Sequence, residues 1–265
     1  MTALPSDDIL TETGFSDAKA GKVLLIACGA LAHEIVALKR LNGWDHLTLQ
    51  CLPAKYHLYP EKIVDAVAET VEKYKNDYAS MFVVYADCGT GGQLEEKCKE
   101  LGIEMIAGPH CYSFFEGNDN FAQHEDEITA FYLTDFLARQ FDAFVWKPLG
   151  LDRHPELLEA YFGNYEKLVY LVQSPDAALE ARARDLADRL GLAYERRETG
   201  YGDLETALAG LGRFRGGQFS NPLNHCAQPI AALGGQIISQ FQAGKFRRGI
   251  NSAHFRKCQA GIERM

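Results

Sequence analysis

The sequence predicts an α/β fold, namely a mostly parallel, doubly wound (Rossmann-like) sheet with helices on both faces. Short apolar runs alternate with amphipathic stretches, and the first run, in "KVLLIACG", is apolar throughout its centre, as in a strand covered on both faces. The chain has 265 residues, 47% hydrophobic and 24% charged, which is typical of a globular protein. We expect the α/β domain over 22–210, between a polar leader (1–21) and a C-terminal tail (211–265).

The elements of the first half follow in order. The first strand is expected in "KVLLIACG", and the following helix in "LAHEIVALKRL", where Leu31, Ile35, Leu38 and Leu41 form one apolar stripe. The second strand is "HLTLQCL", followed by a helix in "YPEKIVDAVAETVEKYK" with Pro60 suited to its first turn. The third strand is "MFVVYAD", its helix is "GGQLEEKCKELG", and the fourth strand is "IEMIAG".

The second half is predicted to continue the alternation. A longer helix is expected over about 126–141, then a fifth strand in "AFVWKPL" and a sixth in "LVYLVQ". An Ala- and Arg-rich helix over 175–190 precedes a seventh strand in "LAYERRE". The tail carries eight Lys and Arg residues and one acidic residue, with weak periodicity, which indicates a basic, partly disordered or loosely packed extension or a self-docking segment. An altered reading frame at the end of the coding region would give a similar composition.

Charge and cysteine content exclude some classes of function. The net charge of -9 argues against a general nucleic-acid binder, because such proteins carry basic faces. No apolar run is long enough for a membrane helix, and the leader is acidic where a signal peptide would be basic, so we expect a cytoplasmic protein. The seven cysteines include no CxxC pair and favour core packing, metal binding or reactive thiols over disulfides.

Cysteine and histidine follow four consecutive predicted strands. The first strand ends at Cys28; the second ends near Cys51, with His57 in the loop after it. The third runs into Cys88, and the fourth turns at "GP" into His110 and Cys111. Because parallel strands bring their carboxyl ends to one edge of a sheet, where ligands bind, we expect one shared metal or cluster site there.

The predicted metal ligands are Cys28, Cys88, Cys111 and His57. Thiolate and imidazole ligands suit zinc or an iron–sulfur cluster, and not magnesium or calcium. Three cysteines could hold a cubane cluster with one iron open to substrate, whereas a histidine in the set would suit zinc. The sequence leaves this choice open. His110 is expected as a further ligand or as an acid/base group, and Asp87 as an acid/base group or as a group that supports the ligands beside Cys88.

Glycines follow Cys88 in "DCGTGGQLEEK" at the start of a helix. The N–H groups of Gly89, Gly91 and Gly92 are candidates to bind an anionic cofactor or substrate, which the helix dipole would favour. The dipole could also activate Cys88 as a nucleophile. The stretch matches neither GxGxxG nor GxxxxGK[ST], so turn glycines without a ligand are the alternative.

The quoted motifs resemble a family known as the domain of unknown function 1638, found in bacteria and methanogenic archaea. The matching stretches run from Val23 to Leu204 and are "LLIACGAL", "LPAKYHLYPEKI", "YADCGTGG", "GPHCYSFF", "FYLTDFLARQFD" and "GLDRHPELLEAYFGNY". The tail is unlike the family's usual ending. The resemblance implies no established activity, but the family's proximity to corrinoid-dependent methyltransferase genes implies a role in one-carbon, methyl-group metabolism.

Three functional hypotheses follow. The first is a cytoplasmic metal- or iron–sulfur-dependent enzyme (a transferase, lyase or hydrolase) acting on a small polar or anionic substrate. The second is a metal-free thiol enzyme with Cys88 or Cys111 as nucleophile and a neighbouring histidine as base. The third is a non-catalytic accessory protein that binds a corrinoid methyltransferase. None of them involves nucleic acid or a membrane.

Overall fold

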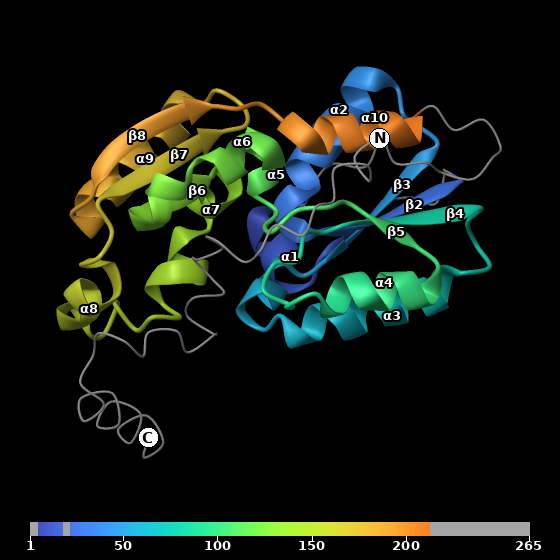
Figure 1. The fold of residues 1–265 in the computed structure, drawn as a ribbon, viewed down its shortest axis with the longest axis horizontal. Helices are drawn as coiled ribbons and strands as arrows, with labels where there is room; N and C mark the ends of the chain where they lie inside the picture. Colours follow the sequence, from blue (N-terminus) through green and yellow to red (C-terminus); the bar gives the residue numbers. More distant parts are fainter. Residues whose placement is uncertain (1–4, 18–21, 213–265) are drawn as a thin grey trace, which may run out of the picture.

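The protein contains two β-sheets with helices packed against both, seen here in a computed structural model that describes residues 5–17 and 22–212 (Figure 1). The first sheet has the strand order β1-β3-β2-β4-β5, and the second has the order β6-β7-β8. The strands are β1 (Phe15–Ser16), β2 (Val23–Cys28), β3 (Leu47–Leu52), β4 (Ser80–Val84), β5 (Glu104–Met105), β6 (Ala130–Thr134), β7 (Lys167–Val172) and β8 (Ala193–Glu198). The predicted α/β class is confirmed.

Helices connect nearly all of these strands. The α-helices are α1 (Asp7–Glu12), α2 (Ala32–Asn42), α3 (Glu61–Tyr74), α4 (Gln93–Leu101), α5 (Ser113–Glu116), α6 (Asn118–Gln123), α7 (Asp135–Arg139), α8 (Leu158–Phe162), α9 (Ala177–Leu190) and α10 (Gly202–Gly212). Shorter helical turns are η1 (Gly29–Leu31), η2 (Ala54–Leu58), η3 (Glu125–Thr129), η4 (Asp142–Trp146) and η5 (Pro155–Leu157).

The first sheet is parallel except at one edge. All six residues of β2 are buried, as expected for a strand with helices on both faces. Its carboxyl end is level with those of its neighbours, since Cys28 pairs with Leu52 of β3 and Ala27 with Val84 of β4. The antiparallel edge strand is β1, which pairs with β3 and comes from the predicted leader.

The connections from β2 and β3 leave the first sheet toward opposite faces. Helix α2 lies on one face, and α3 and α4 lie on the other (Figure 1). In such doubly wound sheets, ligands bind outside the carboxyl ends of the strands where the winding reverses, which here is between β2 and β4. The fold therefore directs attention to the residues that directly follow these two strands.

One residue of the predicted α2 stripe is not in the core. Leu31, Ile35 and Leu38 are buried, whereas Leu41 is 76% exposed. At about 100° of rotation per residue, Leu41 lies about 80° from Leu31 around the helix, and so outside the buried face. The stripe was therefore predicted one turn too long.

The second sheet corrects two sequence predictions. The segment 126–141, predicted as one helix, contains strand β6 followed by α7. The predicted strand "AFVWKPL" instead begins with the helical turn η4. Phe131, Tyr132 and Leu133 are all buried, so this aromatic run is a strand covered on both faces, although its spacing also fits a helix. β6, β7 and β8 are parallel, and this sheet is separate from the first.

Helices near both ends of the described residues contribute contacts between the two halves of the fold. After β8 in the second sheet, α10 returns to lie beside α2 of the first (Figure 1). Asp203 of α10 accepts a hydrogen bond from the backbone N–H of Asn118 (2.8 Å). Asp7 of α1, within the predicted leader, accepts one from Nε of Arg139 in α7 (2.6 Å). Beyond Gly212, the predicted tail lies outside the described residues.

Membrane insertion by a helix finds no support in the described ranges. Within residues 5–17 and 22–212, no helix combines the length and the apolar character needed to cross a bilayer.

Candidate metal centre

Two loops at the carboxyl edge of the first sheet are held together by backbone hydrogen bonds. The N–H of Asp87, after β4, donates to the carbonyl of Gly108, after β5 (3.0 Å). The N–H of Cys88 donates in the same way to the carbonyl of Pro109 (3.1 Å). These bonds extend the β4–β5 pairing beyond the strands, so residues 88 and 111 come together although they are distant in sequence.

The cluster formed there contains three of the four predicted metal ligands. One ligand atom each of His57, Cys88 and Cys111 lies within 4.8 Å of the other two. The two sulfurs are 3.0 Å apart, and both cysteines are free thiols. Cys88 and Cys111 are 6% and 8% exposed, so the thiols are nearly removed from water. One imidazole and two thiols in this arrangement form a donor set that suits zinc.

His57 is oriented by its surroundings. It lies in η2, directly after β3, and its Nδ1–H donates to the backbone carbonyl of Ala54 (3.1 Å). A proton on Nδ1 leaves the lone pair on Nε2, which is the usual arrangement for a metal-binding histidine. The imidazole also stacks on the ring of Tyr85, with centroids 6.1 Å apart.

Burial and mutual interaction shift the pKa values of the cluster. Burial, together with the hydrogen bond and charge of Cys111, raises the pKa of the Cys88 thiol well above its usual value. Burial alone would lower the pKa of His57, but the Cys28 and Cys88 sulfurs raise it well above the usual range. A bound divalent cation reverses both preferences, because it favours thiolates and a neutral imidazole.

Tyr85 adds an unsatisfied polar atom to this region. It directly follows β4 and is fully buried, yet among the described residues its hydroxyl has no hydrogen-bond partner. Burial raises its pKa, and the sulfurs of Cys28, Cys111 and Cys88 raise it further. A buried hydroxyl without a partner requires an explanation, such as a bound ion or ligand. Sequence reasoning missed Tyr85, whose only signal was a phenol in an apolar run three residues before Cys88.

Cys28 lies beside the cluster but outside the group of three. Its sulfur is 3.5 Å from Nδ1 of His57 and accepts a hydrogen bond from the N–H of Ala30 (3.3 Å). The Cys28 sulfur therefore approaches the same ring nitrogen of His57 as the carbonyl of Ala54 does. The expectation that Cys28 is itself a ligand stays a prediction. Cys51, one strand away in β3, is buried, and burial raises the pKa of its thiol.

The glycine-rich turn binds an anion of the chain itself. The Asp87 carboxylate accepts hydrogen bonds from the N–H groups of Gly89 (3.2 Å), Gly91 (3.2 Å) and Gly92 (2.6 Å). It also accepts one from the Thr90 hydroxyl (2.9 Å). The amides predicted to hold an anionic cofactor are thus bonded to Asp87, which gives this carboxylate a structural role. Acid/base catalysis by Asp87 stays a prediction.

The same turn holds Cys88 in a strained conformation. Its φ of +47° makes it the one non-glycine residue with positive φ in the described ranges. Such a conformation costs on the order of 1 kcal/mol or more and persists only where neighbouring interactions enforce it. The bonds of Asp87 provide that enforcement and aim the thiol at the cluster.

We expect replacement of Asp87 with alanine to loosen this turn. The substitution leaves three backbone N–H groups and a hydroxyl without their acceptor, so the free energy of unfolding should fall by about 2 kcal/mol. Urea denaturation measures this loss. Thr90→Ala removes only one of the four donors and should cost clearly less; equal losses would contradict the role assigned to Asp87.

His110 directly precedes Cys111 in sequence and lies outside the group of three. Its ring stacks on Tyr112 with centroids 5.0 Å apart and planes 3° from parallel. Burial lowers its pKa to about 4, against the opposing effect of the Asp87 charge. The imidazole is therefore neutral at physiological pH. Acid/base catalysis by His110 stays a prediction.

Comparison with known families identifies the family of this chain. A family model described as "Protein of unknown function (DUF1638)" matches residues 51–208, more than half of the sequence. The chain belongs to this family. The match includes His57, Tyr85, Cys88 and Cys111 of the DUF1638 chain, whereas Cys28 precedes it. No curated protein and no solved structure matches the chain.

Proposed function

We propose that this DUF1638 protein is a zinc-dependent enzyme whose metal is held by His57, Cys88 and Cys111. The observation that carries the proposal is the grouping of these ligand atoms within 4.8 Å at the carboxyl edge of the sheet, where both cysteines are buried and His57 is partly buried. Three protein ligands are typical of catalytic zinc, because the fourth position stays open to water or substrate, whereas structural sites have four.

The composition of the group favours zinc over an iron–sulfur cluster. A cubane cluster bound through three irons would need a third thiolate, and Cys28 lies outside the group. Zinc held by two thiolates and an imidazole supplies a Lewis acid that activates a bound water or thiol, or polarises a carbonyl. Tyr85 would donate a hydrogen bond to the bound group, and His110 would exchange a proton with the substrate.

The substrate class and the biological setting are further parts of the proposal. The buried site favours a small polar or anionic molecule, since a large one would not reach it. Thiol activation by zinc also suits methyl-group metabolism, the setting implied by the family resemblance. In that setting a corrinoid methyltransferase would be the partner, and co-purification with it would test this part separately.

Metal analysis of the full chain tests the central claim. Protein purified without oxygen, or reconstituted with zinc and then dialysed, should retain one zinc ion per chain and no acid-labile sulfide. If the analysis finds iron with stoichiometric sulfide, the group holds an iron–sulfur cluster and not zinc. Failure to retain any metal would overturn the proposal.

A second candidate function rests on the Cys88–Cys111 contact. With the sulfurs 3.0 Å apart, a metal-free protein could use the pair as a dithiol that an oxidant converts to a disulfide with loss of two hydrogens. Mass spectrometry under non-reducing conditions separates the two functions. A mass lower by two hydrogens after mild oxidation of zinc-treated protein would favour the dithiol, because bound zinc protects thiolates.

A further inference from the structure

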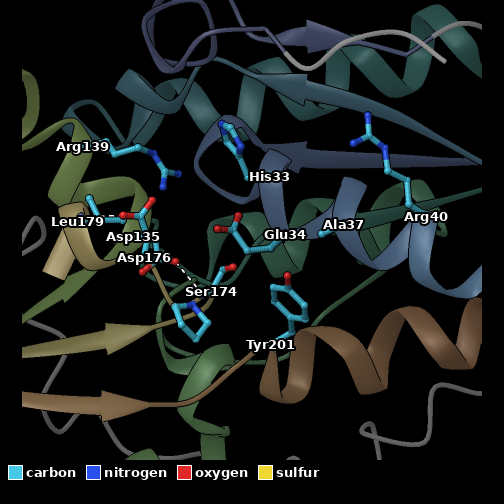
Figure 2. A pocket seen from close by; sticks show the side chains of 11 residues that line it. His33, Glu34, Ala37, Arg40, Asp135, Arg139, Ser174, Asp176, Leu179 and Tyr201 are labelled. Atoms are coloured by element: carbon cyan, nitrogen blue, oxygen red, sulfur yellow. Dashed lines mark hydrogen bonds between the residues drawn. The ribbon is translucent and has the colours of Figure 1, made fainter.

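A second site lies in a cleft between the two sheets. The cleft has a volume of about 360 Å³ and is lined on one side by α2, and on the other by α7 and the turn that leads into α9 (Figure 2). Tyr201, just before α10, lines it as well. None of the residues of the metal cluster line this cleft, so the two sites are separate.

The topology favours a binding site at this place. Asp135 directly follows β6, and Ser174 lies two residues after β7. His33 and Glu34 begin α2, which follows β2 through the short turn η1. The cleft is thus lined by residues that follow the carboxyl ends of strands from both sheets, where α/β proteins bind their ligands.

Among residues 5–17 and 22–212, two buried polar atoms in the cleft have neither a hydrogen-bond nor an ion-pair partner, whereas Nε2 of His33 is paired with Asp7 (3.0 Å). The two atoms are Oε2 of Glu34, a residue only 4% exposed, and Nη2 of Arg139. Figure 2 shows the Glu34 carboxyl directed from α2 into the cleft, with the Arg139 guanidinium entering from the opposite side. Buried polar atoms without hydrogen-bond partners are costly, so these two atoms indicate a ligand that completes them.

The charges around these atoms differ in sign. Nε of Arg139 is bonded to Asp7, which leaves Nη2 as a donor for an anionic group. The Asp135 carboxylate accepts hydrogen bonds from the Tyr170 hydroxyl (2.7 Å) and the N–H of Ser174 (2.9 Å), which hold it beside the cleft. Burial raises the pKa of both the Glu34 and the Asp135 carboxyl, and a cationic group bound between them would lower both values by favouring the ionised carboxylates.

We propose that the cleft binds a small zwitterion of the α-amino-acid class. The carboxylate of the ligand would bind Arg139, and its ammonium group would bind Glu34 and Asp135. The cleft volume is at the lower end of the range for ligand sites, which suits a molecule of this size better than a nucleotide. This inference does not depend on the metal at the other site.

Binding of amino acids to the full-length protein tests the proposal. The common α-amino acids are screened one at a time by thermal shift, and the best is measured by equilibrium dialysis. Two fragments of it serve as matched probes, the acid without the amino group and the amine without the carboxyl group. We expect at least one amino acid to bind, and each fragment to bind at least about tenfold more weakly, because each lacks one charged contact.

Variants connect the binding to the cleft. Glu34→Gln removes the charge with little change in volume and should weaken binding of the amino acid at least about tenfold. Glu96→Gln, on the exposed side of α4, removes a charge far from the cleft and should leave the affinity unchanged. Three results would each overturn the proposal: no amino acid binds the wild-type protein, a fragment binds as tightly as its parent, or Glu34→Gln binds with wild-type affinity.

Discussion

Replacement of Cys88 with serine is expected to abolish zinc retention and the stability that zinc provides. Zinc at about a thousand times its dissociation constant stabilises a folded protein by about 4 kcal/mol. For a domain of this size, that corresponds to a rise in Tm of roughly 10 °C. Cys88→Ser removes one of three ligands, so its Tm should no longer respond to zinc. Thermal unfolding with zinc and with a chelator measures both effects.

A matched cysteine provides the control. Cys98 of α4 is 1% exposed but lies outside the cluster, so Cys98→Ser makes the same chemical change in the core. This variant should lose some stability and keep its response to zinc. His57→Gln should lose the response as Cys88→Ser does, whereas it would leave a Cys88–Cys111 dithiol intact. A full zinc response in Cys88→Ser would exclude Cys88 as a ligand.

The grouping of His57, Cys88 and Cys111 could be predicted from sequence because these residues follow successive strands. Strand ends in a parallel sheet share an edge, so the positions of His57, Cys88 and Cys111 after β3, β4 and β5 were sufficient to expect their meeting. Cys28 has the same kind of position, and its sulfur lies 3.5 Å from Nδ1 of His57, but it is outside the group of three. Sequence order predicts which edge a residue lies on and not where its side chain points.

Other features depended on contacts that leave no local pattern. Asp87 binds the amides of the glycine turn because the chain folds back on itself over five residues, and the sequence alone does not show that the anion belongs to the chain itself. The aromatic run of β6 fits both the helical and the strand periodicity. The sequence therefore predicts a helix where β6 lies and a strand in the following segment, which begins with η4. The cleft unites α2 with α7, which are about a hundred residues apart, and no short motif signals that pairing.

Buried Glu34 leads to the last prediction, a pH-dependent gain of stability when the carboxyl is removed. Burial raises its pKa from 4.5 to about 7. The folded protein therefore binds this proton more tightly than the unfolded chain does. The stabilisation is fully present below pH 4.5 and is lost as the pH rises through about 7. At pH 8 the ionised carboxyl costs up to about 3 kcal/mol, so Glu34→Gln should be more stable than wild type there by an amount of that order.

The comparison across pH contains its own control. At pH 4.5 the wild-type carboxyl is protonated in the folded state and resembles the amide, so the two proteins should unfold at similar urea concentrations. Glu34→Ala also removes the charge but leaves a cavity, so it should show the flattened pH profile of Glu34→Gln at a lower stability throughout. Parallel pH profiles for wild type and Glu34→Gln would show that the carboxyl is not desolvated. A gain at pH 8 would mean that the protein keeps a destabilising carboxyl in its cleft, as expected for a group selected to bind a ligand.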